Sequence, residues 1–181
     1  MMQSVVASAA ERVYLNPNPQ TRKDAMRNLQ AFSDEGRQRA RFAKFPRRKV
    51  CEEVPRFRQC FGWTVITPKI MSQIPFGMKP EVERFKWVKR WFAPDDDYFA
   101  IIYEYIPPSD NKEHIPLMLS QLQFYWLVGF STIPDWDENW TGGILLDFGD
   151  LSNPWEPCWR MSRYHKYVKA DLDEDLEAEG I

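Results

Sequence analysis

The sequence has few of the residues from which most catalytic and metal sites are built. It contains three cysteines, Cys51, Cys60 and Cys158, and only two histidines, His114 and His165. The cysteines are odd in number, and their spacing fits neither a zinc site nor a disulfide framework, which favours a reducing compartment. Two distant histidines are too few for a metal triad, and no nucleophile elbow motif accompanies them. Nucleophilic catalysis of the Cys-His or Ser-His-Asp type is therefore not expected.

Long apolar runs and an excess of one charge are also missing. No apolar run approaches the length needed to cross a bilayer, and the mildly apolar start, Met1 to Ala10, has no basic leader before it. Lys+Arg 24 against Asp+Glu 26 gives a net charge of -2, which creates no global field that recruits nucleic acid or an anionic membrane. We therefore expect an intracellular protein, cytoplasmic or nuclear, that does not associate with membranes.

Local charge is less even than the total. The stretch from Arg37 to Arg58 is rich in arginine and lysine, whereas residues 170–181 are acidic and are expected to form a mobile tail. We interpret the basic stretch as a solvated helix face; a nucleic-acid contact is the alternative and would require strong salt dependence. A protein partner is expected in preference to nucleic acid.

Apolar content is ample, at 44% with 15% aromatic residues, which suffices for the core of one domain. Apolar residues at helical spacing predict helices, each with a start or stop signal beside it. Thr21 and Asp24 form a capping box, Pro116 fits a first turn, and Gly129 is a helix stop. The predicted helices span Met2 to Val13, Thr21 to Phe32, Ser33 to Phe42 and Ile115 to Val128.

Alternating and aromatic runs predict strands between these helices. We expect a strand at Phe57 to Trp63, and Val65 to Ile74 as a connection or one helical turn. Phe85 to Phe92 and Tyr98 to Ile106 should pair as an antiparallel hairpin around the turn at Ala93 to Asp97. A strand is also predicted at Ile144 to Phe148, and a helix or ordered segment at Trp159 to Val168. The fold class is thus α+β, with a small antiparallel sheet packed against helices.

A site-like arrangement lies at Thr141 to Asp150, where paired glycines precede three aliphatic residues and Asp147. Asp147 is either a metal ligand, with Asn139 as its companion, or a carboxylate that caps nearby backbone N–H groups. A pair of acids for glycoside hydrolysis is a further alternative. The acidic residues that bear on that alternative are Asp135, Asp137, Glu138, Asp147 and Asp150.

Four tryptophans flank this stretch in proline-bearing segments. They are Trp136, Trp140, Trp155 and Trp159. Large aromatic side chains are enriched both in cores and at interfaces. The sequence alone leaves both roles open, so all four are candidate interface anchors.

The order of these elements resembles the middle of a protein-kinase-like domain. A strand runs into Tyr103-Glu104-Tyr105-Ile106, a buried helix follows, and a strand leads into Asp147-Phe148-Gly149. The phrase from Asn139 to Gly149 also looks like fungal kinase-like proteins grouped with an inner-kinetochore subunit family. Arg58 to Trp63 is similar to their fourth strand, and Glu35 to Phe42 to the helix before it. The likeness covers roughly residues 34 to 150.

This resemblance implies a reduced kinase-like domain at residues 34–169, preceded by a helical segment at residues 1–33. By the same resemblance, the backbone at Glu104 and Tyr105 would be a vestigial hinge for the adenine of ATP. Asp147 and Asn139 would then hold magnesium.

Departures from the family pattern argue against catalysis. No Gly-x-Gly-x-x-Gly occurs, and Pro134 stands where the resemblance would place the catalytic Asp. The small-lobe strands before Glu35, and the lysine that would pair with it, are not found. We therefore expect a non-catalytic, pseudokinase-type interaction or scaffold protein without a cofactor. The alternative is a phosphotransferase that uses ATP and Mg and takes its small lobe from missing sequence or from another chain.

Overall fold

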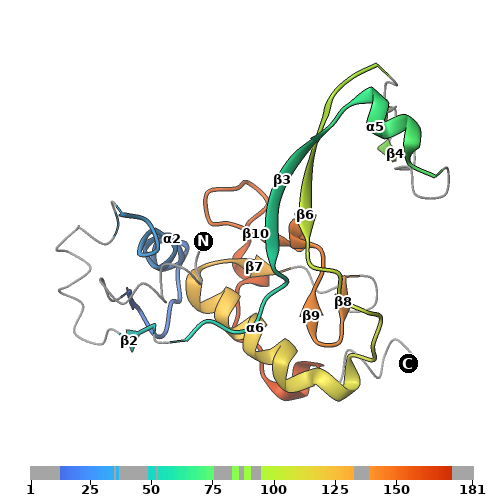
Figure 1. Cartoon of the computed structure of the whole chain (residues 1–181). Coiled ribbons are helices and arrows are strands. Elements are labelled where there is room, and N and C mark those ends of the chain that lie inside the picture. Colours follow the sequence, from blue (N-terminus) through green and yellow to red (C-terminus); the bar gives the residue numbers. More distant parts are fainter. Residues whose placement is uncertain are drawn as a thin grey trace. The chain divides into compact units, whose positions relative to one another are not determined.

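The structure is a computed structural model that describes residues 13–34, 36, 49–51, 53–75, 83–85, 88–90, 95–132 and 139–172. The chain divides into two compact units, one formed by Met1–Arg58 with Ile106–Ile181 and the other by Gln59–Tyr105. Both helices and strands are present, and the described strands form two-stranded antiparallel sheets (Figure 1). The fold is therefore mixed α and β, as expected, with several small sheets in place of the single one predicted.

The first unit is arranged around helix α6 (Ile115–Val128), which has the bounds that the sequence predicts. Gly129 ends it with φ 109°, and its N–H donates to the Tyr125 carbonyl at 3.0 Å. A Cβ atom at Gly129 would lie 2.4 Å from the carbonyl oxygen of Ala25. Glycine is thus required here both by the left-handed backbone and by the close approach of the preceding helix.

That preceding helix is α2 (Arg22–Gln30), and its capping box forms as predicted. The Asp24 N–H donates to Thr21 Oγ1 at 3.1 Å, and Thr21 Oγ1 donates to Asp24 Oδ2 at 2.7 Å. Asn28 is buried on this helix and donates to the carbonyls of Asn16 at 2.9 Å and Leu127 at 2.7 Å. Helix α2 is therefore joined to the end of α6 through a buried amide.

Helix α6 is largely buried, with Pro116 and Ser120 exposed. Its residues enter three clusters of buried side chains: Met118, Leu122 and Tyr125 in the first, Phe124 and Val128 in the second, and Trp126 in the third. Apolar burial contributes about 25 cal/mol per Å², and α6 supplies buried side chains to all three clusters. Partners from distant segments complete the clusters, among them Leu15, Phe32, Leu145, Trp159 and Leu172.

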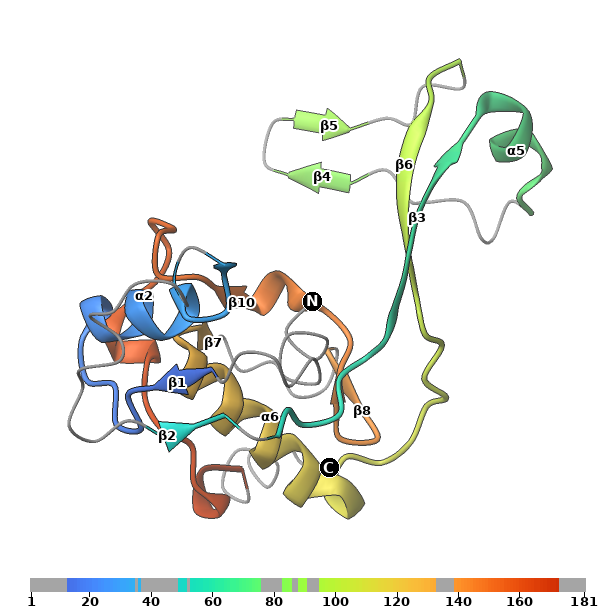
Figure 2. The same ribbon diagram turned by 60° about the vertical axis from the view of Figure 1, so that its left-hand side comes forward.

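Short strands and turns surround α6 in the first unit. Strand β1 (Tyr14–Leu15) pairs with β2 (Lys49–Val50), which lie side by side in Figure 2, and β7 (Ser131–Thr132) pairs with β10 (Leu151–Ser152). The 3-10 turns η2 (Lys112–His114) and η4 (Met161–Arg163) complete the unit. These elements are only two or three residues long, and such short strand pairs are not stable alone in water. Their conformation therefore depends on packing against α6.

The paired glycines form the turn of a hairpin between β8 (Trp140–Thr141) and β9 (Ile144–Leu145). Gly142 and Gly143 have φ of 55° and 74°, the positive values that a type I′ turn requires. The predicted strand at Ile144 to Phe148 is wrong beyond Leu145, because Asp147 caps the 3-10 turn η3 (Phe148–Asp150). A side-chain bond to the backbone competes here with the strand ladder.

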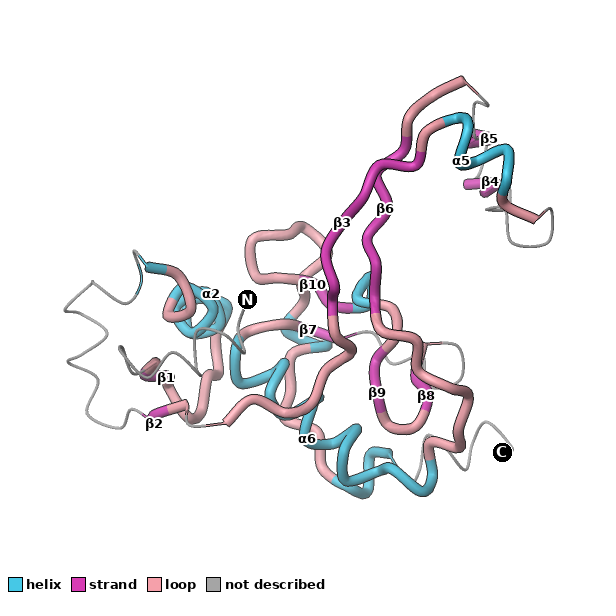
Figure 3. Tube along the Cα trace, in the orientation of Figure 1, coloured by secondary structure: helices cyan, strands magenta, loops and turns pink. Residues whose placement is uncertain are grey.

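The second unit consists of a long two-stranded ribbon with short elements at one end. Strand β3 (Cys60–Ile66) pairs with β6 (Tyr98–Tyr103) in antiparallel orientation (Figure 3). In the register of this pair, Trp63 is opposite Ile101 and Val65 is opposite Phe99. Helix α5 (Pro68–Gln73) follows, capped by Thr67 with proline in its first turn. Val65 to Ile74 was predicted as a connection or one helical turn; the segment is strand to Ile66 and helix from Pro68 to Gln73, as the second alternative expects for its later part.

The predicted hairpin between Phe85–Phe92 and Tyr98–Ile106 is wrong in its partners. Strand β5 (Val88–Arg90) pairs with β4 (Glu83–Phe85), and β6 pairs with β3 instead. Phe85 and Val88 are partners in the register of this pair, and pairing between positions so close in the sequence costs less entropy than pairing across a longer loop. This local closure takes the strand at 88–90 away from β6.

Several predictions fall at the limits of the described residues. Most of the helix predicted at Met2 to Val13, and most of that predicted up to Phe42, lie outside them. The segment from Trp159 to Val168 is ordered and contains η4. Leu172 is fully buried in the first cluster, so packing extends at least to this residue; the rest of the acidic tail lies outside the described part of the chain.

Gln121 offers a test of how α6 holds the β8–β9 hairpin. Its Nε2 donates to the Gly143 carbonyl at 2.6 Å, and its Oε1 accepts from the Leu145 N–H at 3.4 Å, with the side chain fully buried. Gln121→Leu should lower the free energy of unfolding by about 2–4 kcal/mol, because it leaves two buried backbone groups unpaired. Urea denaturation measures this, with the exposed neighbour change Ser120→Ala as the control. Equal, small effects of both substitutions would contradict the assignment.

Candidate functional site

Asp147, the predicted metal ligand, is exposed and acts as a cap. Its Oδ1 accepts a hydrogen bond from the Gly149 N–H at 2.7 Å, at the start of η3. This is the capping alternative that the sequence left open. A carboxylate in this position satisfies a backbone donor at the beginning of a turn.

Asn139, the predicted companion of Asp147, has a different partner. Its Nδ2 donates to Asp150 Oδ2 at 2.5 Å, and its carbonyl accepts from the Leu146 N–H at 2.7 Å. Across the ranges that the structure describes, no group of three or more His, Cys, Asp or Glu side chains is placed to hold a metal ion. The Asn139 side chain therefore bonds Asp150, whereas the Asp147 carboxylate bonds the backbone N–H of Gly149. The two predicted metal ligands thus have different partners.

Glu104 and Tyr105, the predicted hinge, lie at the end of the ribbon in the second unit. The Glu104 N–H donates to the Gln59 carbonyl at 2.7 Å, while Glu104 Oε2 accepts from the Gln59 N–H at 3.1 Å. The Tyr105 side chain is 77% exposed. Glu104 therefore uses both its backbone donor and its carboxylate to close the end of the β3–β6 pair.

The four tryptophans separate into different environments. Trp140 and Trp159 are buried in the core of the first unit, and Trp155 is 47% exposed. Trp136 lies outside the described residues. Burial of Trp140 and Trp159 supports the core interpretation for these two, which leaves Trp155 as the described tryptophan of this group with surface to offer a partner.

An aromatic cluster at the end of α6 was not found from the sequence. Trp159 Nε1 donates to the Gly129 carbonyl at 3.0 Å, and the Tyr164 hydroxyl donates to the Trp126 carbonyl at 2.9 Å. These two side chains satisfy carbonyl groups that the end of a helix leaves open. Burial, with a smaller effect of the Asp24 charge, raises the pKa of Tyr164 well above its ordinary value.

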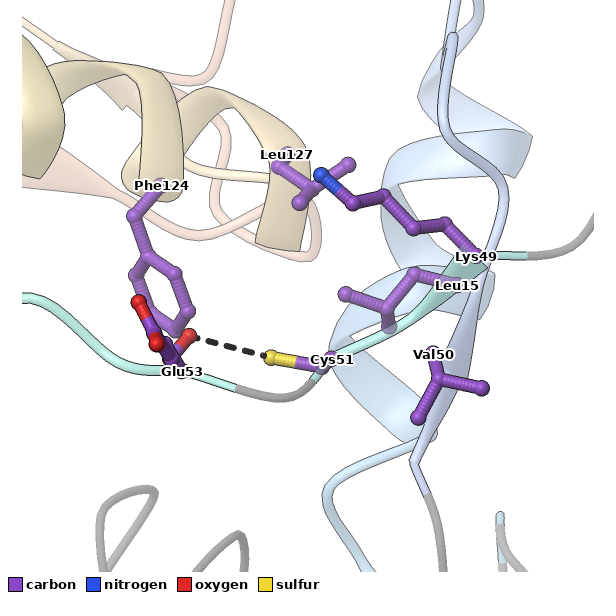
Figure 4. A pocket seen from close by; sticks show the side chains of 7 residues that line it. All are labelled: Leu15, Lys49, Val50, Cys51, Glu53, Phe124 and Leu127. Atoms are coloured by element: carbon purple, nitrogen blue, oxygen red, sulfur yellow. Dashed lines mark hydrogen bonds between the residues drawn. The ribbon is translucent and has the colours of Figure 1, made fainter.

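A pocket of about 290 Å³ lies beside α6 (Figure 4), and its lining is Leu15, Lys49, Val50, Cys51, Glu53, Phe124 and Leu127. Leucine and phenylalanine side chains form its apolar surface. The Cys51 thiol donates weakly to the Glu53 carbonyl at 3.6 Å. Burial raises the pKa of Cys51, against a smaller lowering by Lys49, so the thiol stays protonated at neutral pH and is a poor nucleophile.

The exposed apolar surface of the second unit is the most unusual feature of the described residues. We define the ribbon face as Trp63, Val65, Phe99 and Ile101, which the register places on one side of the β3–β6 pair. Trp63 is 68% exposed, Phe99 79% and Ile101 60%. The sequence signal for the ribbon face is the complete lack of charged residues in Cys60–Ile66 and Tyr98–Tyr103. Natural strands that face water usually carry charged residues.

The alkylation rates of the three cysteine thiols test whether Cys51 is buried where it lines the pocket. With iodoacetamide at pH about 7.5, the exposed Cys60 and Cys158 should be alkylated first, and Cys51 at least about tenfold more slowly, because it is buried and its pKa is raised. Peptide mass spectrometry over time gives the three rates, with the urea-unfolded chain as the control in which all three react alike. Preferential alkylation of native Cys51 would contradict the environment described.

The chain matches no protein-family model, and no curated protein or solved structure is significantly similar to it. Within the described residues, no helix is both long and apolar enough to span a bilayer.

Proposed function

We propose that this chain is a non-catalytic relative of the kinase-like class that acts inside the cell by binding a protein partner. The observation that carries the proposal is the ribbon face, where Trp63, Phe99 and Ile101 are largely exposed. Monomeric soluble proteins rarely expose contiguous apolar patches of more than a few hundred Å², and larger ones mark interaction sites. Aromatic side chains in such a patch are typical interface anchors.

The character of the ribbon face favours protein over nucleic acid as the partner. Nucleic-acid surfaces depend on lysine and arginine that neutralise phosphates. The two strands that form the ribbon face contain neither residue. An apolar surface of a partner protein is what such a face can desolvate at a gain in free energy.

The proposed lack of catalysis is supported by what the kinase-like residues do. Phosphoryl transfer depends on positioned metal-holding groups and on donors free to contact the nucleotide. Asp147 accepts from Gly149, Asn139 donates to Asp150, and the Glu104 N–H donates to Gln59. Each of these groups has a structural partner of its own in the fold.

Thermal denaturation with ATP and magnesium tests the proposal. A bound ligand at about 100 times its Kd would stabilise the fold by about 2.7 kcal/mol, which corresponds to a rise in Tm of roughly 5–10 °C for a chain of this size. We expect no rise, for the wild type or for Asp147→Asn, in which the amide still caps η3.

The control is Asp95→Asn, which removes one charge at an exposed position of the second unit. A saturable, magnesium-dependent rise in Tm that Asp147→Asn abolishes and Asp95→Asn retains would contradict the proposal and favour a phosphotransferase.

A further inference from the structure

We infer that residues 160–169 form a second binding surface of this chain, and that this surface takes an acidic segment of a protein partner. The inference rests on the proposed function, in which the partner is a protein, and adds the chemistry that would recognise part of it. We call residues 160–169 the basic segment. The segment contains neither Asp nor Glu, and its cations are Arg160, Arg163, Lys166 and Lys169. All four of these side chains are exposed.

The two arginines of the basic segment differ from the others whose side chains the structure describes. Those others all have interaction partners, and they are Arg22, Arg27, Arg56 and Arg58. Within the described residues, neither guanidinium group of Arg160 and Arg163 has a hydrogen bond or an ion pair. Their N–H donors can therefore bind carboxylates, which a guanidinium group pairs with through two parallel hydrogen bonds.

The acidic residues that flank the basic segment bond the backbone of local turns. Asp171 Oδ2 accepts from the Val168 N–H at 2.7 Å. On the other side, Glu156 Oε2 accepts from the Asn153 N–H at 3.3 Å. Neither carboxylate forms an ion pair with the basic segment in the part of the chain that the structure describes, so the segment offers unpaired positive charge.

Buried aromatic side chains fix the backbone of the basic segment. Tyr164 and Tyr167 are buried between the exposed cations. The Tyr164 hydroxyl donates to the Trp126 carbonyl at 2.9 Å, and the Tyr167 hydroxyl bonds Thr132 Oγ1 at 2.8 Å. A surface that is ordered before binding loses less conformational entropy when a partner is bound.

The surroundings of these cations favour a polypeptide over nucleic acid. Surfaces for single-stranded nucleic acid combine cations with exposed rings on which bases stack. Here Tyr164 and Tyr167 are buried, and the ring of His165 lies against Tyr167 with centroids 4.4 Å apart. Met161 and Val168 are each 50% exposed in the same segment, and they offer apolar contacts to the side chains of a peptide.

Fluorescence anisotropy of the full chain with a labelled peptide tests the inference. The probe is a short fluorescein-labelled peptide of glutamate with interspersed leucine. Its binding should be saturable and should weaken as NaCl is raised from about 50 mM to about 500 mM, because salt screens exposed charges. The same peptide with glutamine in place of glutamate should not bind. The double substitution Arg160→Glu with Arg163→Glu should weaken binding of the acidic peptide at least about tenfold, since like charges then meet.

The matched control is Lys69→Glu with Lys112→Glu. It changes the net charge by the same amount at exposed positions outside the basic segment, and it should bind the peptide as the wild type does. Arg160→Lys with Arg163→Lys keeps the charge and should retain most of the binding. Far-UV circular dichroism checks that all variants keep their secondary structure.

A wild-type chain that does not bind the acidic peptide would overturn the inference, as would an equal loss in the Lys69 and Lys112 control. Tighter binding to an oligonucleotide of equal charge, or to vesicles of anionic lipid, would also overturn it. Residues 173–181 of this chain carry acids as well. If peptide binding required Asp173→Asn, Glu174→Gln and Asp175→Asn, the occupant would be the chain's own acidic end and the inference would be wrong.

The failure of this inference and that of the proposed function are distinguishable. A chain that binds neither the acidic peptide nor ATP leaves the proposed function standing with a partner of different chemistry. ATP-dependent stabilisation, in contrast, defeats the proposed function whether or not the peptide binds.

Discussion

Burial of most of helix α6 is the constraint on which the first unit depends. The helix has no charged residue, and its side chains enter all three buried clusters. A helix with apolar residues around most of its circumference has little surface suited to water, so other segments must cover most of it. Two polar side chains of the helix also bond within the chain: Gln121 donates to the Gly143 carbonyl of the β8–β9 hairpin, and Gln123 donates to the Tyr167 carbonyl. Strands of two residues are ordered because they cover this helix.

The β3–β6 ribbon differs from α6 in burial, because its aromatic side chains Trp63 and Phe99 are largely exposed. An isolated pair of strands is marginally stable in water even with good cross-strand contacts. The Trp63–Phe99 contact and the bonds between Gln59 and Glu104 strengthen the pair without removing its apolar surface from water. The two units therefore differ in the burial of their apolar side chains, which are mostly covered within the chain in the first unit and largely exposed on the ribbon of the second.

Local signals in the sequence predicted local structure well. Three signals located α2 and α6: the capping residues Thr21 and Asp24, the glycine stop at Gly129, and apolar residues at helical spacing between Ile115 and Val128. Each of these signals acts over a few helical turns. Strand partners were predicted poorly, since the pairing of β6 with β3 depends on a contact across more than thirty residues. Two-residue strands carry little pattern: β9 lay within the strand predicted at Ile144 to Phe148, whereas β1, β2, β7, β8 and β10 were not predicted.

For the candidate site, too, the sequence identified local features but not the contacts between distant residues. The sequence identified Asp147 and Asn139 as candidate metal ligands and left a capping role for Asp147 open. The hydrogen bond between Asn139 and Asp150 was not predicted. The tryptophans could not be sorted, because Trp159 is buried through a bond to Gly129 that no local pattern encodes. The ribbon face had a detectable signal in its lack of charge, but the same signal is typical of strands buried in a core.

Hydrogen–deuterium exchange of the isolated chain tests most directly whether the two units are stabilised differently. The account predicts that amides of α6 are strongly protected, and that amides of β3 and β6 exchange much faster, because the ribbon buries little of its apolar surface. Ribbon amides protected as strongly as those of α6 would contradict it.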